Sequence, residues 1–253
     1  MMNSLSYALT KALTKQRRKM LSKKIYDSHN GIVQAGPYKN MKLGDVSNVS
    51  QGSLGLKVLG LYESPVVNKI SSIGSFDDLI NFGAADGYMA LGPLFNRSCS
   101  RSICFELTEK GREAIKRNAE LNKIGNNVEI RGPADANTIN NLKELEINPS
   151  KSVVLCDIEG DEFKVFTKEL FDFLQGATII IELHDKLMKN SDSFRKDLIS
   201  KIPLDAKTQI IAEKQSPSFE NIHDLEVLSD NDRAVVMSEG RKFFGEWLVI
   251  EFE

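Results

Sequence analysis

The feature that most limits how this chain can fold is an apolar segment that runs straight into a turn of small residues. Residues 79–82 predict a buried strand, and residues 83–87, with the sequence Gly-Ala-Ala-Asp-Gly, predict the turn. Small residues let the backbone pass close to a bound molecule. The helix expected from Tyr88 would point its free N–H groups at the same place, where they bind a phosphate or a carboxylate. The sequence therefore predicts a strand, a turn and a helix that together hold an anionic group.

From residue 76 onward, short apolar segments alternate with helical ones. The expected strands are residues 79–82, 103–105, 128–130, 153–156, 178–181, 209–212 and 248–250. Such alternation is typical of a mostly parallel sheet with helices on both faces and right-handed crossovers. The predicted fold class is therefore α/β, with the sheet in a domain of residues 60–253.

Between the strands, Thr108 predicts the start of a helix that ends near Gly125. A second helix is expected over residues 163–174, where phenylalanine and leucine recur at helical spacing. Residues 233–238 fit either a strand or a helix.

Residues 1–59 are expected to form an N-terminal appendage, a basic helix followed by a cap or lid segment. The helix has an apolar stripe of Leu5, Leu9, Leu13, Met20 and Leu21. It also carries seven basic residues, which are Lys11, Lys15, Arg17, Arg18, Lys19, Lys23 and Lys24. Two hypotheses fit this composition: one face packs on the domain, or the helix contacts a membrane surface or a partner protein. A homodimer is a further alternative.

The chain has 253 residues, and its 33 basic and 35 acidic side chains nearly cancel. This balance disfavours bulk binding to nucleic acid, and no nucleic-acid partner is expected. No segment reaches the roughly 20 apolar residues of a membrane-spanning helix, and no secretory signal is apparent. A cytoplasmic protein is expected, with the basic helix as an alternative contact to the inner membrane surface. Cys99, Cys104 and Cys156 lack metal-binding spacing and are expected to be buried thiols.

A dinucleotide-binding turn would have glycines at positions 83, 85 and 88, whereas this chain has Ala85 and Tyr88. This disfavours NAD. The segment instead resembles motif I of the class I S-adenosylmethionine-dependent methyltransferases, which share a Rossmann-like fold and hold the methionine part of the methyl donor in this turn. The resemblance implies donor contacts from Asn81, Gly83, Ala85, Asp86 and Gly87.

Two further strand ends fit the same donor. Glu106 follows the second expected strand, and its two carboxylate oxygens match the two adjacent hydroxyls of a ribose; an exposed glutamate at a helix start is the alternative. After the third strand, Ala134 and Asp135 lie where such enzymes hold the adenine, with the acid accepting from the exocyclic amine. Asp135 fits equally well as the cap of the helix expected from Asn137.

Acidic residues follow the fourth and fifth expected strands. Residues 157–162 and 181–185 resemble the Asp-x-Glu-Gly-x-Glu and Ile-Glu-x-His segments of the FkbM-like methyltransferases, and residues 60–63 resemble their Gly-x-Tyr-Glu element. The matches span residues 60–185, about half of the chain. The resemblance implies donor contacts from Glu63 and Asp157, and methyl transfer to a hydroxyl of a sugar, a polysaccharide or a secondary metabolite. Asn81 departs from the family, since many members have Asp there.

The chemistry points to the same strand ends. A sulfonium methyl is already activated, so the enzyme must mainly hold the acceptor in line with it. The acceptor hydroxyl must lose its proton to a base, or a metal must lower the pKa of the hydroxyl. His184 is the candidate base, with Asp157 and Glu182 as further catalytic residues. The alternative is Mg²⁺ or Mn²⁺ held by Asp157, Glu182 and either His184 or Asp185.

A structural interpretation of these acids is also open: Glu159 and Glu162 cap the next helix, and His184 hydrogen-bonds a loop. Two other functions remain as alternatives. One is a non-catalytic binding module that contacts a partner through the basic helix. The other is a nucleotide-cofactor oxidoreductase, which Tyr88 disfavours. Acids at the mouth of the acceptor site also disfavour RNA, because they repel phosphates.

Overall fold

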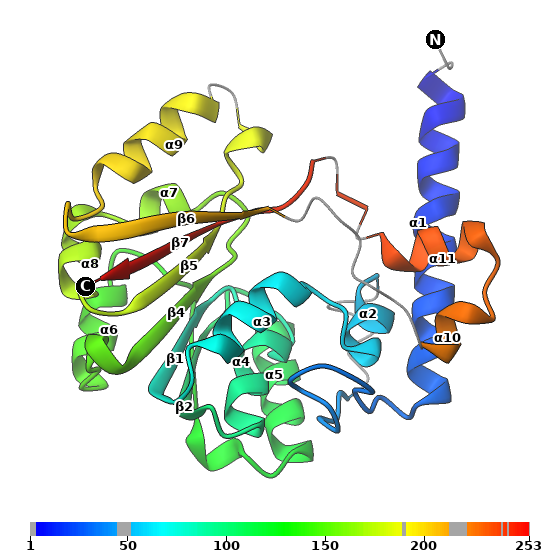
Figure 1. Cartoon of the computed structure of the whole chain (residues 1–253), viewed down its shortest axis with the longest axis horizontal. Helices are drawn as coiled ribbons and strands as arrows, with labels where there is room; N and C mark the ends of the chain where they lie inside the picture. The colour runs from blue at the N-terminus through cyan, green and yellow to red at the C-terminus, as the bar shows by residue number, and fades with distance from the viewer. Residues whose placement is uncertain are drawn as a thin grey trace.

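The computed structural model describes residues 4–44, 52–188, 191–212, 222–238, 240–241 and 243–252. These residues form a seven-stranded sheet with helices on both faces (Figure 1). The strands are β1 (Phe76–Phe82), β2 (Cys99–Phe105), β3 (Val128–Arg131), β4 (Ser152–Cys156), β5 (Thr178–Glu182), β6 (Ala206–Ala212) and β7 (Glu246–Phe252). Their order is β3-β2-β1-β4-β5-β7-β6; the first five are parallel, and β7 is antiparallel to both of its neighbours. The predicted α/β fold is confirmed.

Eleven α-helices lie in the described residues, together with three short 3₁₀ turns. The helices are α1 (Ser4–Ser28), α2 (Leu54–Leu59), α3 (Ser64–Ser72), α4 (Tyr88–Phe95), α5 (Glu109–Leu121), α6 (Thr138–Glu144), α7 (Glu162–Val165), α8 (Lys168–Phe173), α9 (Ser191–Ser200), α10 (His223–Glu226) and α11 (Asp230–Met237). The 3₁₀ turns are η1 (Gly125–Asn127), η2 (Pro149–Lys151) and η3 (Asp185–Leu187).

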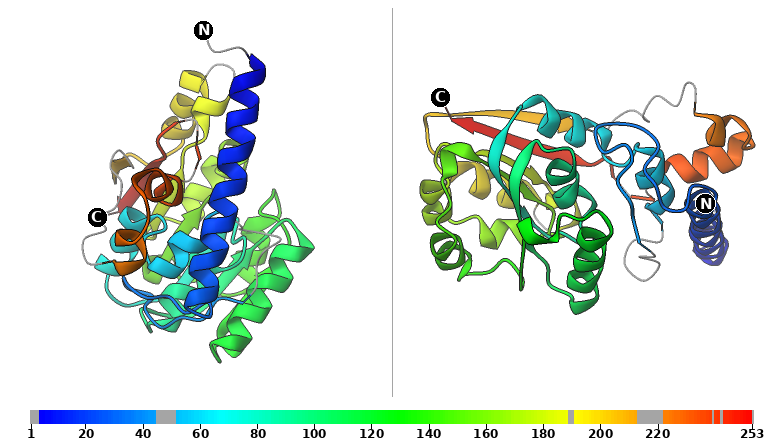
Figure 2. Two further views of the ribbon diagram at one scale, coloured as in Figure 1. Left: turned by 90° about the vertical axis from the view of Figure 1, so that its right-hand side faces the viewer. Right: turned by 90° about the horizontal axis from the view of Figure 1, so that it is seen from below.

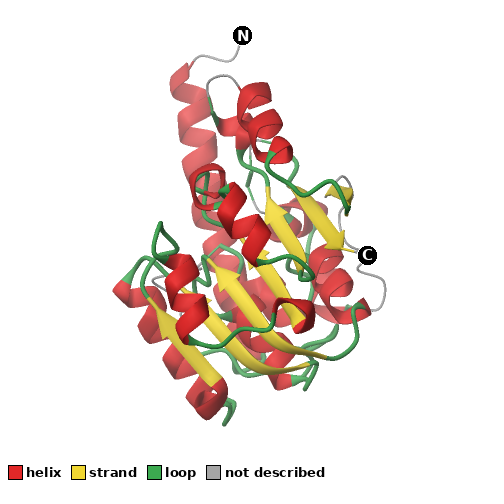
Figure 3. Cartoon of the chain, turned by 90° about the vertical axis from the view of Figure 1, so that its left-hand side faces the viewer, coloured by secondary structure: helices red, strands yellow, loops and turns green. Residues whose placement is uncertain are grey.

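Successive residues of the central strands enter two different apolar cores, as the two-residue period of a strand requires. Leu79 of β1 belongs to one core and Ile80 to the other, and Val153 and Val154 of β4 alternate in the same way. Helices α2 to α5 pack on the first core and α6 to α9 on the second, so the strands form a layer between helices (Figure 3). Burial on both faces explains the consecutive apolar residues at Leu79 and Ile80 of β1 and at Val153, Val154 and Leu155 of β4.

The helices follow the sequence with one correction. Thr108 caps α5 as predicted, and this helix ends before Gly125. The single helix expected over residues 163–174 is wrong: it is divided into α7 and α8, because the Thr167 hydroxyl accepts a backbone N–H bond and starts a new helix. Residues 233–238, which fitted a strand or a helix, lie in α11 except for the last one.

The C-terminal half of α1 packs against α2 and α11, whereas its N-terminal half stands clear of the body (Figures 1 and 2). Leu21 and Ile25 are buried in this contact. Leu9, Leu13 and Met20 are each more than half exposed. The predicted apolar stripe is therefore divided, with Leu21 facing the body and Leu9, Leu13 and Met20 facing solvent.

The segment after α1 is fastened to α5 by two asparagine side chains. Asn118 accepts a hydrogen bond from the Gly44 N–H at 2.7 Å, and Asn122 donates to the Lys42 carbonyl at 2.7 Å. Tyr38 of this segment is 1% exposed and belongs to the same core as β1. The division of the chain at residue 59 stays a prediction, and residues 45–51 of the expected cap segment lie outside the described part.

The three cysteines are free and buried, as expected. Burial raises the pKa of the Cys99 and Cys104 thiols to about 12, so neither is a reactive thiolate near neutral pH. Among the described helices, none combines the length and apolar character that spanning a membrane requires.

Candidate active site

The strand order β1-β4-β5 brings the ends of three strands side by side. Asn81 lies near the end of β1, Asp157 follows β4, and Glu182 ends β5, with His184 two residues later. In an open α/β sheet, ligands bind beyond the carboxyl ends of the strands. The topology therefore gathers candidates that lie about a hundred residues apart in the sequence.

The turn after β1 is shaped by its close approach to the loop after β4. Gly83, Ala85 and Gly87 all have positive φ, at 85°, 49° and 83°. A Cβ atom at Gly83 would collide with the backbone carbonyl oxygen of Asp157, so only glycine fits there. The small residues in this turn thus serve packing between the two loops, and they leave the turn open to the strand-end pocket that it lines.

Asp86, which was predicted to contact the methyl donor, is 1% exposed and is hydrogen-bonded within the protein. Its carboxylate accepts from Lys57 Nζ at 2.6 Å and from the Tyr88 N–H at 3.1 Å. Lys57 is 3% exposed and also lies 4.8 Å from the centre of the Tyr62 ring. The sequence prediction missed Lys57; its only signal was a single lysine inside the apolar segment of α2.

Glu106 ties the end of β2 to the turn after β1. Its Oε2 accepts from the Ala85 N–H at 2.9 Å, while Oε1 accepts from the Thr108 N–H at 2.8 Å and hydroxyl at 2.7 Å. A carboxylate offers about four lone-pair positions, so these bonds leave little capacity for ribose hydroxyls. Contact between Glu106 and a ribose stays a prediction, and such contact would have to replace part of this network.

Ala134 and Asp135 line a pocket between α6 and α7, with a volume of about 350 Å³. The Asp135 carboxylate accepts a hydrogen bond from the Asn137 N–H at 2.8 Å, and the backbone N–H of Asp135 donates to the Thr138 hydroxyl. Helix α6 begins at Thr138 with Asn137 in the N-cap position and no side-chain cap bond, so Asp135 bonds the turn before the helix and does not cap it. The pocket keeps the adenine hypothesis open, because one oxygen of the Asp135 carboxylate is left for a ligand.

A small pocket of about 40 Å³ lies between the ends of β1 and β4. Its lining includes Lys57, Glu63, Asn81, Asp157 and Trp247. In the described part of the chain, Asn81 Oδ1 and Trp247 Nε1 are buried and have no hydrogen-bond partner. Buried polar atoms are rarely left unpaired, so both atoms call for a partner from outside the chain, a bound ligand or an ordered water. Trp247 was missed from sequence, because it lies on β7, far from every motif.

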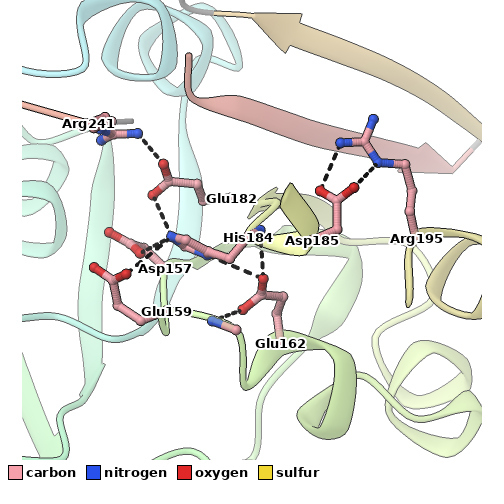
Figure 4. Close-up of polar contacts among 9 residues, drawn as sticks. Asp157, Glu159, Glu162, Glu182, His184, Asp185, Arg195 and Arg241 are labelled. Carbon is pink, nitrogen blue, oxygen red and sulfur yellow. Dashed lines mark hydrogen bonds and ion pairs between the residues drawn. The ribbon is translucent and has the colours of Figure 1, made fainter. Parts of the chain in front are cut away.

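His184 lies at the centre of four carboxylates (Figure 4). Its Nδ1 is 3.2 Å from Glu162 Oε1, and its Nε2 is 3.6 Å from an oxygen of each of Asp157, Glu159 and Glu182. Glu162 is fully buried and accepts from the backbone N–H of His184 at 2.9 Å as well as from the Gly160 N–H. Glu162 therefore orients the imidazole ring in addition to bonding the loop before α7.

The carboxylates set the protonation of His184. Burial lowers its pKa, but the hydrogen bond with Glu162 and the charges of Asp157 and Glu159 outweigh burial, so the pKa is raised above the ordinary value. His184 therefore keeps its proton to higher pH than a free histidine. A role as general base requires this proton to leave first.

Asp157 and Glu182 form a carboxylate pair in which the Glu182 side chain is buried and the Asp157 side chain is partly buried. Burial raises the pKa of Glu182 to about 10; the charges of Asp157 and Glu63 act in the same direction, and Arg241 opposes them. Burial also raises the pKa of Asp157, against the effect of His184. The pair therefore binds a proton more readily than two exposed carboxylates.

The candidates proposed as metal ligands lie in two places. Asp157, Glu182 and His184 each offer a ligand atom, and these atoms lie within 4.8 Å of one another. Asp185 instead forms an ion pair with Arg195 at 2.8 Å, beside this cluster (Figure 4). Of the two ligand sets considered, the geometry favours the one with His184.

Arg241 is a further residue that the sequence prediction missed. It lies between α11 and β7 and donates to Glu182 Oε1 (Figure 4). It also donates to Glu63 Oε1 at 2.7 Å. No local pattern around Arg241 signals this role, because both partners come from distant parts of the chain.

No protein-family model matches this chain, and no curated protein matches it. Among solved structures, it is similar to an O-methyltransferase from Bacillus cereus in complex with SAH, at 11% identity and a TM-score of 0.51, covering 92% of this chain and 91% of that one. It is also similar to the O-methyltransferase TomG from Streptomyces achromogenes, involved in tomaymycin synthesis and in complex with SAM. For this enzyme the identity is 13%, the TM-score 0.53, and the coverage 84% of this chain and 91% of that chain.

A tRNA methyltransferase from B. subtilis has 12% identity and a TM-score of 0.45, with coverage of 74% and 64%. At these identities the likeness shows the fold alone. The fold is the Rossmann-like fold of the class I S-adenosylmethionine-dependent methyltransferases, as the sequence predicted.

Proposed function

We propose that this protein is an FkbM-like, S-adenosylmethionine-dependent methyltransferase that transfers a methyl group to a hydroxyl of a saccharide or a secondary metabolite. The observation that carries the proposal is the pair of buried, unpaired atoms Asn81 Oδ1 and Trp247 Nε1, which line the same pocket within the described residues. One is a hydrogen-bond acceptor and the other a donor. A ligand that presents both a donor and an acceptor at this point satisfies both.

The amino-acid end of S-adenosylmethionine has this character, since it carries an ammonium and a carboxylate group. Asn81 and Glu63 can accept from the ammonium, and Lys57 and Trp247 can donate to the carboxylate. The rest of the donor then extends over the turn after β1 toward Glu106.

The acidic cluster adjoins this pocket through Asp157, which lines the pocket and lies 3.6 Å from His184. An acceptor hydroxyl held there loses its proton to His184 once that residue has given up its own, or to the Asp157–Glu182 pair. Oxygen as the methylated atom is supported by the two O-methyltransferases that share the fold. A divalent cation on Asp157, Glu182 and His184 is the alternative means of acidifying the hydroxyl.

Calorimetric titration with S-adenosylmethionine, S-adenosylhomocysteine and NAD tests the donor. The first two are expected to bind, and Trp247→Phe is expected to weaken both about tenfold, because one hydrogen bond of about 1.4 kcal/mol is lost while the aromatic packing is kept. Asn81→Asp serves as the matched control: it keeps an acceptor and should bind at least as well.

Failure to bind either compound, or a preference for NAD, would overturn the proposal. Donor binding without transfer to any hydroxyl acceptor in a panel of saccharides would instead support the non-catalytic binding module. A Trp247→Phe variant that binds as tightly as the wild type would show that Trp247 and the pocket at the end of β1 do not hold the methyl donor.

A further inference from the structure

Helix α1 carries an apolar stripe that faces solvent. Leu9 is 60% exposed, and Leu13 and Met20 are each 56% exposed. Because an α-helix turns by about 100° per residue, these three side chains lie within about 40° of one another around the helix axis. Leu21 and Ile25, which are buried against the body, lie about 80° or more from them by the same repeat. The exposed stripe of Leu9, Leu13 and Met20 is therefore a second apolar face, separate from the one that holds α1 on the body.

Basic residues flank the exposed stripe. Helix α1 has seven lysines and arginines and a single acid, Asp27. By the helical repeat, Lys15 and Lys19 lie on one side of the exposed stripe and Lys24 on the other. All three are exposed, and none of them forms an ion pair within the described residues. These flanking lysines can therefore pair with anions outside the chain.

The two features together select one kind of surface. A second copy of this chain would cover the exposed stripe, but it would bring two strongly basic helices together, and like charges across an interface repel. A nucleic acid would pair with the flanking lysines but leave the exposed stripe in water. A bilayer with anionic headgroups accepts apolar side chains at the headgroup boundary and attracts lysines to its surface. Only the bilayer satisfies both features at once.

We propose that α1 is a docking surface for a membrane of anionic phospholipids. The helix lies in the plane of the membrane surface, with the exposed stripe entering the headgroup boundary and the flanking lysines reaching the lipid phosphates through their long side chains. None of the described helices is long and apolar enough to cross a membrane, so the contact is peripheral. The inference concerns a different part of the molecule from the proposed methyl transfer and does not depend on that reaction.

The test is co-sedimentation of the full chain with two kinds of vesicle, one of phosphatidylcholine alone and one with about a third of phosphatidylserine. The chain is expected to bind the anionic vesicles at least tenfold more tightly. Lys15→Gln/Lys19→Gln/Lys24→Gln should weaken that binding about 100-fold, because each lysine near an anionic surface contributes about fivefold. Leu9→Gln/Leu13→Gln keeps every charge and should weaken binding at least tenfold, because the stripe no longer enters the apolar boundary.

Lys110→Gln/Lys116→Gln/Lys123→Gln is the matched control. It removes the same charge from α5 and the residues just after it, where these lysines are also exposed. Its affinity for the anionic vesicles should stay within about threefold of the wild type. The proposal is wrong if the wild type does not bind anionic vesicles, if the control loses as much affinity as the α1 lysine variant, or if Leu9→Gln/Leu13→Gln binds as tightly as the wild type.

Light scattering on the same preparations tests the second copy. A wild-type dimer that Leu9→Gln/Leu13→Gln converts to a monomer, with no vesicle binding by either form, would assign the exposed stripe to a homodimer and overturn the proposal.

Titration of the same preparations with S-adenosylhomocysteine separates this proposal from the methyltransferase proposal. The α1 variants should bind it as the wild type does. Vesicle binding without S-adenosylhomocysteine binding would overturn the methyltransferase proposal and leave the membrane surface standing. Binding of S-adenosylhomocysteine without vesicle binding would do the reverse.

Discussion

The two regions of this molecule that gather the most charge differ in how far water reaches them. Helix α1 carries seven lysines and arginines, and its first half stands clear of the body (Figure 2). At the strand ends, Glu63, Glu162, Glu182 and Asp185 are each less than 5% exposed. Water screens the charges of α1, whereas every buried charge must be compensated inside the protein. Each buried charge at the strand ends therefore has a specific partner in the protein. The exposed charges of α1 mainly give that helix a net positive charge.

Two ion pairs of equal length make this comparison quantitative. Arg17 of α1 lies 2.6 Å from Asp232, and Lys57 lies 2.6 Å from Asp86. The Arg17 side chain is 49% exposed, but the Lys57 and Asp86 side chains are only 3% and 1% exposed. From distance alone, the two pairs should contribute equally to the free energy of unfolding. Burial instead predicts a much larger contribution from Lys57 and Asp86.

The largest effect on stability is expected from Lys57→Met. This change leaves the Asp86 carboxylate buried without its cation and should lower the free energy of unfolding by about 3–5 kcal/mol. Urea unfolding measures it. The double variant Lys57→Met/Asp86→Asn should recover much of the loss, because no charge is then left alone. If Lys57→Met lowers the free energy of unfolding by less than about 1 kcal/mol, the buried pair contributes no more than an exposed one, contrary to the comparison.

A large effect on turnover is expected from His184→Ala. Loss of a group that takes the acceptor proton typically lowers turnover about 100-fold or more, while donor binding should change little. Radiolabelled methyl transfer to an acceptor found in a saccharide panel, together with calorimetry of donor binding, measures both. His223→Ala in α10 is the control and should change neither. Equal losses of turnover and donor affinity in His184→Ala would contradict the role of His184 as the base.

An intermediate effect is expected from Glu246→Gln, since Glu246 is 17% exposed and binds Lys186 and Arg195. The hydrogen bond with Lys186, and then that with Arg195, lowers the Glu246 pKa below its ordinary value. A lowered folded-state pKa gives stability that is present above the unfolded pKa of about 4.3 and is lost as the pH falls through the folded value. The variant should lose about 1 kcal/mol at pH 7 and less at pH 3.

Urea unfolding at pH 7, 5 and 3 follows this loss. A loss of the same size at all three values would show that it comes from packing and not from charge.

The smallest effect is expected from Arg17→Gln. Both of its hydrogen bonds to Asp232 are short, at 2.8 Å and 2.6 Å, yet solvent screens the pair. The urea midpoint should not move beyond experimental error, at low or at high salt. A shift as large as that of Glu246→Gln would show that α1 depends on this pair for its position. The membrane or partner contact expected for α1 stays a prediction.

Local patterns were enough to predict most of the sheet. The apolar runs gave the strands because both faces of the parallel strands are buried, and small residues marked the turn at residues 83–87 because the backbone there has positive φ and closely approaches Asp157. Since ligand sites in such folds follow the strands, Glu106, Glu182 and His184 could be selected from their positions alone. The break at Thr167 was missed, because the helical spacing of apolar residues continues across it.

The partners of the selected residues could not be predicted in the same way. Lys57, Arg241 and Trp247 reach the strand ends from α2, the segment before β7, and β7 itself. No periodicity links them to the motifs, since their contacts depend on how distant elements pack.

The sequence by itself thus determined the α/β fold and the positions of its strands, because these follow from local apolar periodicity and backbone conformation; ligand binding at the strand ends stays a prediction. Only the tertiary structure decided that Asp86 is held by Lys57, that Asp185 pairs with Arg195 rather than joining His184, and that Arg241 reaches Glu182. The physical reason is that a buried charge takes whichever opposite charge the fold brings within reach, and sequence separation does not limit that choice.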